Sequence, residues 1–244
     1  MSLLADWHAT VTGLLDRAAT SQAEAVEAAA RRVADTLAGP SRLFSFGTGH
    51  GHLLALEIFY RAGGLARVIP MLDEDLMLHR SASRSSQLER EGTRATSLLR
   101  IYRPGPGDVL LVASSSGRNA VPIEVAAGAS AAGAAVIALT GVAGSRSRPS
   151  RHASGRVLAD VADVVLDTGA PDGDAAQAVP GFRERMGPVS TIVGAFLLHA
   201  VVLRAAELST ARGVVPELWR SANAGGDEAN AELLARLQET IPHL

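Results

Sequence analysis

Apolar and polar positions along this chain switch between a helical period and short buried runs. From residue 3 to residue 38 apolar side chains recur at helical spacing, and Ser21 with Glu24 fits a capping box that would divide the segment into two helices. Five short β-rich runs follow at residues 43–46, 66–69, 109–113, 135–139 and 164–166. Helical patterns are predicted at residues 52–62, 86–102, 121–132, 188–212 and 227–238, with Pro188 in the first turn of the long one.

Strands that alternate with helices predict an α/β fold, in which a parallel sheet is covered by helices on both faces. Ligands of such sheets bind beyond the carboxyl ends of the strands. The 244 residues fit one domain better than two. Apolar residues make up 47% of the chain and aromatic residues only 4%, so the core must consist mainly of alanine, valine and leucine.

Charge and composition argue against several classes of protein. The formal net charge is −2, and no basic surplus indicates a nucleic-acid partner. We interpret the basic run at residues 145–156 as a mobile, solvated loop. The absence of cysteine excludes disulfides and thiolate nucleophiles. The apolar stretch at residues 189–203 is shorter than the roughly 20 residues of a membrane span, and the N-terminus has no signal-peptide pattern, so we expect a cytoplasmic protein with no membrane partner.

Two turns rich in glycine and serine follow the first and third predicted strands. Each leads into a helix with a glutamate ten positions after the start of the turn, from Gly47 to Glu57 and from Ser114 to Glu124. Because parallel strands end at one edge of a sheet, we expect both turns at the same edge.

The turn SSSGRN, residues 114–119, brings three hydroxyls, backbone N–H groups and a helix N-terminus together. Such donors suit a phosphate or sulfate, and Arg118 adds positive charge. An ordinary helix cap is the alternative, because serine and asparagine are favoured there for local reasons. A cap needs one such residue and four are present, which favours phosphate binding.

The turn GTGHGH, residues 47–52, combines glycines with Thr48 as a donor. It does not fit the G-x-G-x-x-G pattern of nucleotide cofactors, and we expect no cofactor. His50 and His52 form an isolated H-x-H that would need a third ligand from His79 or nearby acids, so we expect no metal. Two interpretations stay open: a histidine that contacts substrate and transfers protons, or loop histidines that bond only locally.

Glu57 and Glu124 stand among apolar residues, where a carboxylate is either paired or functional. Burial would raise the pKa of either glutamate towards that of a useful base. Arg61, four positions after Glu57, is the obvious structural partner, so both roles of Glu57 stay open. Glu124 has no cation at that spacing, which favours function.

Two further segments are candidates for the site. The polar, irregular residues 71–90 either close over a site or form a surface excursion with a helix start near Ser86. Ser190 and Thr191 place hydroxyls near the start of the long helix. His199 lies on the apolar stripe of that helix, and we interpret it as a core or interface residue.

At these motifs the chain resembles the sugar isomerase (SIS) domain family of phosphosugar-binding proteins, over about residues 30–212. The family pattern S-x-S-G-x-T is matched in the second turn, with Asn119 in place of threonine. The pattern G-x-G-x-S is matched in the first turn, with Gly51 in place of serine. The whole chain is similar to an uncharacterised bacterial subgroup that resembles N-acetylmuramic acid 6-phosphate etherases and phosphosugar isomerases in plan.

The resemblance implies a three-layer α/β/α sandwich with a five-stranded parallel sheet, flavodoxin-like, with extra N- and C-terminal helices. Residues 1–244 would form a single SIS domain, with a helical segment at 1–38, a core at 39–212 and an extension at 213–244. The resemblance also implies a homodimer or higher homo-oligomer with the site near the interface, and no redox cofactor.

It further implies roles for single residues. Ser114, Ser116 and Asn119 would hold the sugar phosphate, and Glu57 matches the family's catalytic glutamate. Gly194 aligns with a late-helix catalytic histidine of sedoheptulose-phosphate isomerases, which His50 or His52 would replace. From the residues and the resemblance together, the expected catalytic residues are Glu57, His50, His52 and Glu124. The expected substrate-binding residues are Gly47, Thr48, Gly49, Ser114, Ser115, Ser116, Gly117, Arg118, Asn119, Ser190 and Thr191.

Two functional hypotheses follow. The first is an enzyme that acts on a sugar phosphate or amino-sugar phosphate, an isomerase or a related lyase or etherase, in which a glutamate abstracts a proton beside a carbonyl. The second is a non-catalytic phosphosugar sensor or regulatory subunit. No basic helix-turn-helix pattern precedes residue 40, which weighs against a DNA-binding sensor and leaves a protein partner open.

Overall fold

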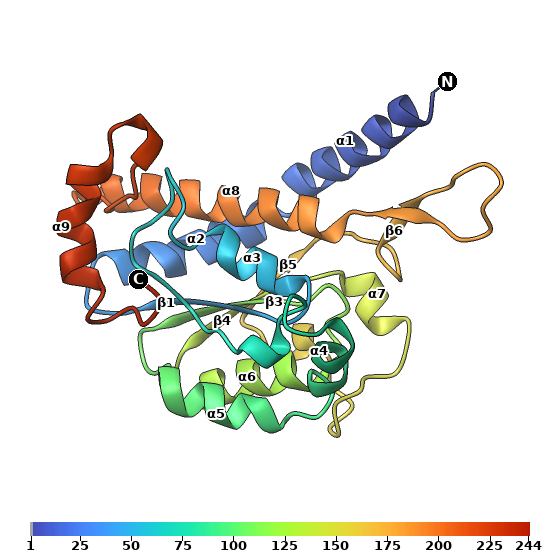
Figure 1. The fold of residues 1–244 in the computed structure, drawn as a ribbon, viewed down its shortest axis with the longest axis horizontal. Helices are drawn as coiled ribbons and strands as arrows, with labels where there is room; N and C mark the ends of the chain where they lie inside the picture. Colours follow the sequence, from blue (N-terminus) through green and yellow to red (C-terminus); the bar gives the residue numbers. More distant parts are fainter. Residues whose placement is uncertain (1) are drawn as a thin grey trace.

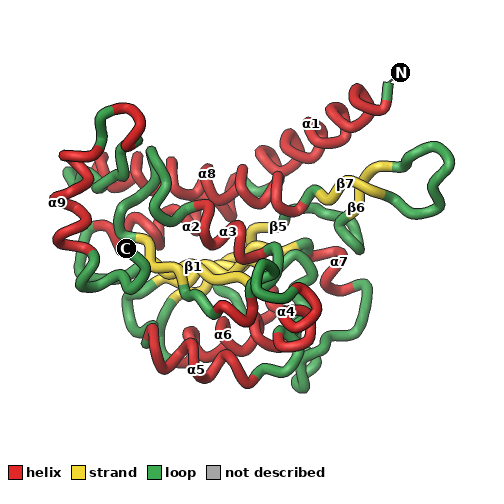
Figure 2. The backbone as a smooth tube through the Cα atoms, viewed as in Figure 1, coloured by secondary structure: helices red, strands yellow, loops and turns green. Residues whose placement is uncertain are grey.

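The computed structural model describes residues 2–244, which fold into three layers (Figure 1). The middle layer is a parallel sheet in the order β2-β1-β3-β4-β5. Figure 2 shows these strands between two layers of helices. The strands are β1 (Leu43–Gly47), β2 (Val68–Pro70), β3 (Val109–Ala113), β4 (Ala135–Thr140) and β5 (Val164–Asp167). The predicted α/β sandwich with a five-stranded parallel sheet is therefore confirmed.

Each strand buries alternate side chains in two separate cores, since successive side chains of a strand point to opposite faces. Leu43 and Leu111 belong to the core beneath one helical layer, and Phe44 and Leu110 to the core beneath the other. The first layer consists of α1 (Leu3–Ser21), α2 (Ala23–Leu37), α3 (Gly51–Glu57) and α8 (Ser190–Ala211). The second contains α5 (Thr93–Tyr102), α6 (Ala120–Ala131) and part of α9 (Asp227–Leu237).

Short elements cover the edges of the sheet. They are η1 (Glu74–Leu76), α4 (Ala82–Leu88), α7 (Val142–Arg146), η2 (Leu158–Asp160) and η3 (Ala222–Ala224). By length and composition α8 could span a membrane. In this fold it packs on α2 and α3 above the sheet, and Val193, Leu197 and Val201 are fully buried there.

Three expected helix boundaries were wrong. The predicted helix 86–102 is two helices, because the chain turns at Gly92 with φ of 72°. The predicted helix 52–62 ends at Glu57, before Tyr60 adopts φ of 45°. The capping box of Ser21 and Glu24 does not form: the first two helices meet at Gln22, whose side chain accepts a hydrogen bond from Asp167 N instead.

An antiparallel hairpin between β5 and α8 was not predicted. Its strands are β6 (Ala175–Gln177) and β7 (Met186–Pro188), so Pro188 ends a strand and α8 begins two residues later. Figure 1 shows the hairpin projecting beside α1. Thr10 of α1 donates a hydrogen bond to Gln177, and the Trp7 ring lies against Gly187. The hairpin depends on these distant contacts, which periodicity in its own short strands cannot reveal.

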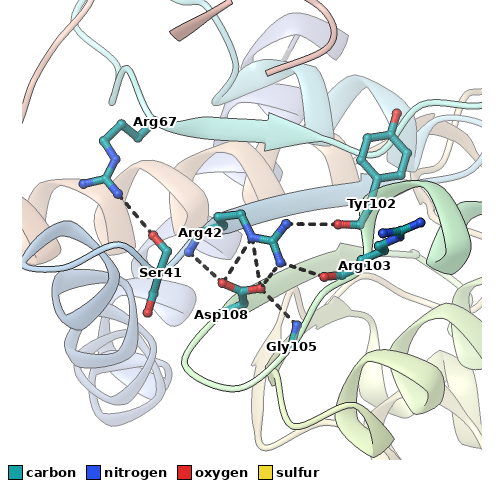
Figure 3. A network of polar contacts seen from close by, with 7 residues as sticks. All are labelled: Ser41, Arg42, Arg67, Tyr102, Arg103, Gly105 and Asp108. Atoms are coloured by element: carbon teal, nitrogen blue, oxygen red, sulfur yellow. Dashed lines mark hydrogen bonds and ion pairs between the residues drawn. The ribbon is translucent and has the colours of Figure 1, made fainter. Parts of the chain in front are cut away.

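At the amino ends of β1 and β3 an ion pair between the buried Asp108 and the half-buried Arg42 joins the sheet to α5 (Figure 3). The Asp108 carboxylate accepts hydrogen bonds from the backbone N–H groups of Arg42 and Gly105 and from the Arg42 guanidinium. The same guanidinium donates to the carbonyls of Tyr102 and Arg103 at the C-terminus of α5. This network stabilises the edge of the sheet opposite to the one where a ligand is expected.

Candidate functional site

A cavity of about 490 Å³ opens at the carboxyl edge of the sheet. Its walls are the turns after β1, β3, β4 and β5, the end of α4 and the start of α8. Ten of the expected site residues line it: Thr48, Gly49, His50, Ser114, Ser115, Ser116, Arg118, Asn119, Ser190 and Thr191. The two turns that share one plan in the sequence therefore do meet at one edge.

The first and second turns are in direct contact. A Cβ atom at Gly51 would lie 2.3 Å from the carbonyl oxygen of Ala113, at the end of β3. No side chain fits there without moving the backbone. The same contact explains why glycine, and not serine, stands at this position of the first turn.

The second turn is shaped by Gly117, which has φ of 59°. A Cβ atom there would lie 2.6 Å from Thr140 Oγ1, so the turn packs tightly on β4 while Gly117 itself stays behind the cavity wall. Ser114 Oγ accepts a hydrogen bond from Gly117 N. Within residues 2–244 the hydroxyls of Ser115 and Ser116 make no hydrogen bond, although both residues line the cavity.

Of the first three residues of α6, only Ala120 keeps a free N–H within residues 2–244, because Val121 N donates to the carbonyl of Glu89 and Pro122 has no N–H. Asn119 is the N-cap residue, yet its side chain does not cap the helix. Its Oδ1 accepts a hydrogen bond from Arg151 Nη1 at 2.9 Å. The Arg118 Nε atom is buried and has no partner among the described residues. The turn is therefore not an ordinary capped helix start, and the hydroxyls of Ser115 and Ser116 are available to an anion.

The cavity contains one glutamate that the sequence interpretation missed. Glu89 is half-buried at the end of α4, and its Oε2 accepts a hydrogen bond of 2.7 Å from Thr48 Oγ1. Burial raises the pKa of the Glu89 carboxyl above its usual value, against the lowering effect of the Thr48 hydrogen bond. Only the polar character of residues 71–90, noted as a possible cover for a site, pointed in its direction.

The two histidines of the first turn have different surroundings. His50 is exposed and lines the cavity. His52 is buried on α3 outside the cavity lining, and its burial, followed by the nearby His79, lowers its pKa. Among the residues that the structure describes, no three histidine or acidic side chains gather as metal ligands.

The start of α8 already holds a carboxylate of this chain. Asp174 accepts hydrogen bonds from the backbone N–H groups of Val189 and Ser190 and, at 2.6 Å, from Ser190 Oγ. Ser190 therefore lines the cavity with its hydroxyl engaged. Thr191 lines the cavity beside it. A carboxylate therefore occupies the anion-binding position at the start of α8, whereas at the start of α6 the described residues bond a backbone carbonyl and no carboxylate.

The two glutamates expected from sequence lie outside the cavity lining, as does Gly47 at the end of β1. Glu57 bonds both to Arg61, at 2.9 Å, and to His199 Nε2, at 2.9 Å. Glu124 bonds to His152 Nε2 at 2.8 Å. Each carboxylate is thus paired, and the partner of Glu124 comes from the basic run 145–156.

That basic run is anchored, in contrast to the expected solvated loop. Arg151 N donates to the carbonyl of Arg118, and Arg118 Nη1 donates to the carbonyl of Pro149. Arg148, which lines the cavity, pairs with Asp172. The run therefore packs against the second turn, and Arg148 adds a charged side chain to the cavity wall.

Known proteins resemble the chain in sequence over nearly its full length. A family model for the SIS domain matches residues 6–141. A UPF0309 protein of Listeria monocytogenes serotype 4b is 40% identical over 232 residues, which cover 95% of this chain and 94% of that protein. A UPF0309 protein of Brucella anthropi is 43% identical over 242 residues, covering 98% and 96%.

Solved structures share the fold at low sequence identity. A phosphoheptose isomerase from Francisella tularensis superposes with a TM-score of 0.57 at 14% identity, covering 84% of this chain and 96% of that one. The Vibrio vulnificus NanR protein, complexed with ManNAc-6P, superposes with a TM-score of 0.52 at 16% identity, covering 97% and 70%. At these identities the likeness concerns the fold alone.

Proposed function

This chain belongs to the SIS domain family, and from that premise we propose that its cavity binds a sugar phosphate and transfers a proton beside the sugar carbonyl. The phosphate lies at residues 114–119 and the N-terminus of α6. The sugar extends towards Thr48, His50 and Glu89. The presence of Glu89 in the cavity, with a raised pKa, is the observation that carries the catalytic part of this proposal.

Several observations support the phosphate position. Ser115 and Ser116 offer hydroxyls that no protein group uses within residues 2–244. The α6 N-terminus adds the Ala120 N–H and the positive end of the helix dipole. Arg118 lines the cavity and forms no ion pair with any described carboxylate. The filled N-terminus of α8 offers no comparable seat, since Asp174 already occupies it.

Glu89 is the general base in this proposal. A carboxylate with a raised pKa binds a proton more readily at neutral pH, which suits reversible proton transfer. It removes the proton from the carbon beside the carbonyl, and the electron pair passes to the carbonyl oxygen to give an enediolate. Return of the proton to the neighbouring carbon completes an isomerisation, whereas loss of a leaving group completes an elimination. His50, exposed in the same cavity, is the group that protonates the oxygen.

The solved structures with this fold include both enzymes and regulators. The neighbour from Francisella tularensis is a phosphoheptose isomerase, and the one from Vibrio vulnificus is NanR complexed with ManNAc-6P. A sensor needs only the phosphate-binding site at residues 114–119. We favour the enzyme, because Glu89 lies beside the proposed phosphate position, where its carbonyl accepts from Val121 N of α6. A desolvated carboxylate there raises the cost of binding an anion and would serve no purpose in a sensor.

The experiment that tests the proposal is a thermal-shift screen of sugar phosphates, each beside its unphosphorylated sugar. A ligand at 100 times its Kd adds about 2.7 kcal/mol of stability. Stabilisation that requires the phosphate group supports phosphate binding at residues 114–119. Turnover of the stabilising compound is then assayed with the wild type and Glu89→Gln. Stabilisation without turnover of any compound would favour the sensor, and no shift with any sugar phosphate would refute both.

We also propose that the protein is a homodimer, joined through the outer surface of α3 and α8. Exposed apolar side chains gather there, which soluble monomers rarely leave uncovered. Glu57 of α3 and His199 of α8 bond to each other on this surface, so these two polar groups need no partner from a second chain. The exposed apolar residues are Leu53, Leu56, Tyr60, Ile192, Phe196 and Leu203. A second copy is the partner whose apolar surface matches by symmetry.

A further inference from the structure

Asn119 has an unusual place at the start of α6. It is the N-cap residue and is buried, yet its side chain makes no hydrogen bond to the helix. Its one bond goes to Arg151, which is 32 residues away in the sequence. A capping role therefore does not explain why asparagine stands at this position of the cavity wall.

The partner of Asn119 determines how its amide is turned. A guanidinium only donates hydrogen bonds, so the atom of Asn119 that faces Arg151 at 2.9 Å must be the carbonyl oxygen Oδ1. The Nδ2 group, with two N–H donors, is then directed away from Arg151. Within residues 2–244 no protein atom accepts from Nδ2, and Asn119 lines the cavity beside Ser115 and Ser116. The amide thus presents donors where the phosphate is proposed to lie.

Arg151 is itself held in place from several sides. Its backbone N–H donates to the carbonyl of Arg118, at 2.9 Å. The next residue, His152, bonds through Nε2 to Glu124 of α6, at 2.8 Å. Glu124 of α6 thus holds the segment of His152 and Arg151, and Arg151 in turn holds Asn119, the N-cap residue of the same helix. This accounts for Glu124 as an anchor, because its carboxylate points to His152 and away from the cavity lining.

The charge around Arg151 also fits an anion. Arg151 and Arg118 form no ion pair with a described carboxylate. Burial, and then the like charges of Arg90 and Arg118, lower the pKa of Arg151, and the Glu89 carboxylate acts in the opposite direction. Three arginines therefore lie near one carboxylate next to the second turn, and a bound dianion would relieve their mutual repulsion.

We infer that Arg151 is a positioning residue, which holds Asn119 Oδ1 so that the Nδ2 amide donates to the phosphate, with the Glu124–His152 pair anchoring the segment that carries it. This inference rests on the proposed phosphate seat. It also explains how asparagine replaces threonine there: a hydroxyl rotates freely to donate, whereas an amide must be turned the right way.

The test is a double-mutant cycle between positions 119 and 151, with inorganic phosphate as the probe and its Kd measured by calorimetry at pH 8. Arg151→Met is expected to weaken binding about tenfold, the loss of one charge-assisted hydrogen bond. In the Asn119→Thr background the same change should cost about fivefold less, because the hydroxyl needs no positioning. The general electrostatic effect of Arg151 is equal in both backgrounds and cancels. Asn119→Ser is the second background if Asn119→Thr does not fold.

Controls separate positioning from a merely structural role. Arg156→Met changes an exposed arginine of the same segment whose side chain, within residues 2–244, hydrogen-bonds only to Ser154, and it should leave the phosphate Kd unchanged. Arg151→Lys keeps a donor and should restore most of the affinity. With a substrate in hand, Arg151→Met should raise KM more than it changes kcat, with both measured on the plateau above the acid limb, because the charge of Arg151 also lowers the pKa of the Glu89 carboxyl.

The outcomes distinguish this inference from the proposed function. Equal costs of Arg151→Met in both backgrounds, with a wild type that binds phosphate, would overturn the inference and leave the proposed seat intact. A wild type that binds neither phosphate nor any sugar phosphate would overturn both.

Discussion

Thr48 Oγ1 donates a hydrogen bond of 2.7 Å to Glu89 Oε2, across 41 positions of the sequence. The bond links the turn after β1 to the end of α4, and it orients the one glutamate that lines the cavity. Opposing effects act on the pKa of the Glu89 carboxyl. Burial, the largest effect, raises the pKa, whereas the hydrogen bond from Thr48 and then the charges of Arg90 and Arg151 lower it. This relationship makes the proposed base testable in two independent ways.

Glu89→Gln should lower kcat by about 10²–10⁴-fold on any sugar phosphate that the wild type turns over. Glutamine has nearly the same shape and still accepts a hydrogen bond from Thr48, but it cannot take up a proton at neutral pH. Steady-state kinetics should therefore show that Glu89→Gln has lost turnover, whereas the phosphate-dependent thermal shift should show that it still binds the sugar phosphate.

Glu57→Gln and Glu124→Gln are the matched controls, since each changes a paired glutamate outside the cavity lining. Both variants should keep kcat within a few-fold of the wild type. A collapse of kcat in Glu57→Gln, with Glu89→Gln unaffected, would assign the base to the helix after the first turn, as the family resemblance implies.

Thr48→Val should shift the acid limb of the kcat/KM profile to higher pH. The base must be ionised to act, so activity rises with pH through the pKa of Glu89, which already lies above its usual value. Valine removes the hydrogen bond that lowers this pKa, and the pKa rises further. A substrate phosphate also titrates, near pH 6, but its pKa does not respond to Thr48 in the free substrate.

The measurement is the pH dependence of kcat/KM for the wild type and for Thr48→Val on one substrate. The quantity to compare is the pH at which the acid limb inflects in each protein, not the absolute rate. An acid limb that stays in place would mean that Glu89 is not the group that titrates.

The sequence predicted the sheet well because its strands are short buried runs that periodicity reveals directly. All five strands were located to within two residues at each end, and the turns at Gly47 and Ser114 do meet at one edge. Local chemistry could also identify the open donors of Ser115 and Ser116. These features depend on residues close together in the chain.

Contacts between distant segments could not be predicted in the same way. Glu57 and Glu124 stand among apolar residues in the sequence, but His199 and His152 come from far along the chain to pair with them. Glu89 looked like one polar residue among many, since only the packing of α4 against the first turn buries it. No spacing rule links residues that meet only when the sheet forms.

Leu203→Glu should convert the proposed dimer to monomers. Leu203 is 71% exposed on α8, so a charge there costs little in the isolated chain but is costly in a buried apolar interface. Sedimentation velocity or light scattering measures the molar mass. Ile101→Glu is the matched control, because Ile101 is 64% exposed on α5 in the opposite layer and should not change the mass. A wild type that is monomeric at high concentration would rule out the proposed interface.

Asp108→Ala should destabilise the fold by about 3 kcal/mol while leaving kcat unchanged, since it strands two backbone donors and the Arg42 guanidinium. Asp108 directly precedes β3, at the amino edge of the sheet, whereas the cavity opens at the carboxyl edge, so its effect should appear in urea denaturation and not in the kinetics of folded protein. Asp108→Asn should cost less, because the amide oxygen still accepts from the backbone. Asp35→Ala, which breaks the exposed pair with Arg212, should produce no resolvable change. Equal losses for Asp108→Ala and Asp35→Ala would show that the buried network contributes no more than a surface ion pair.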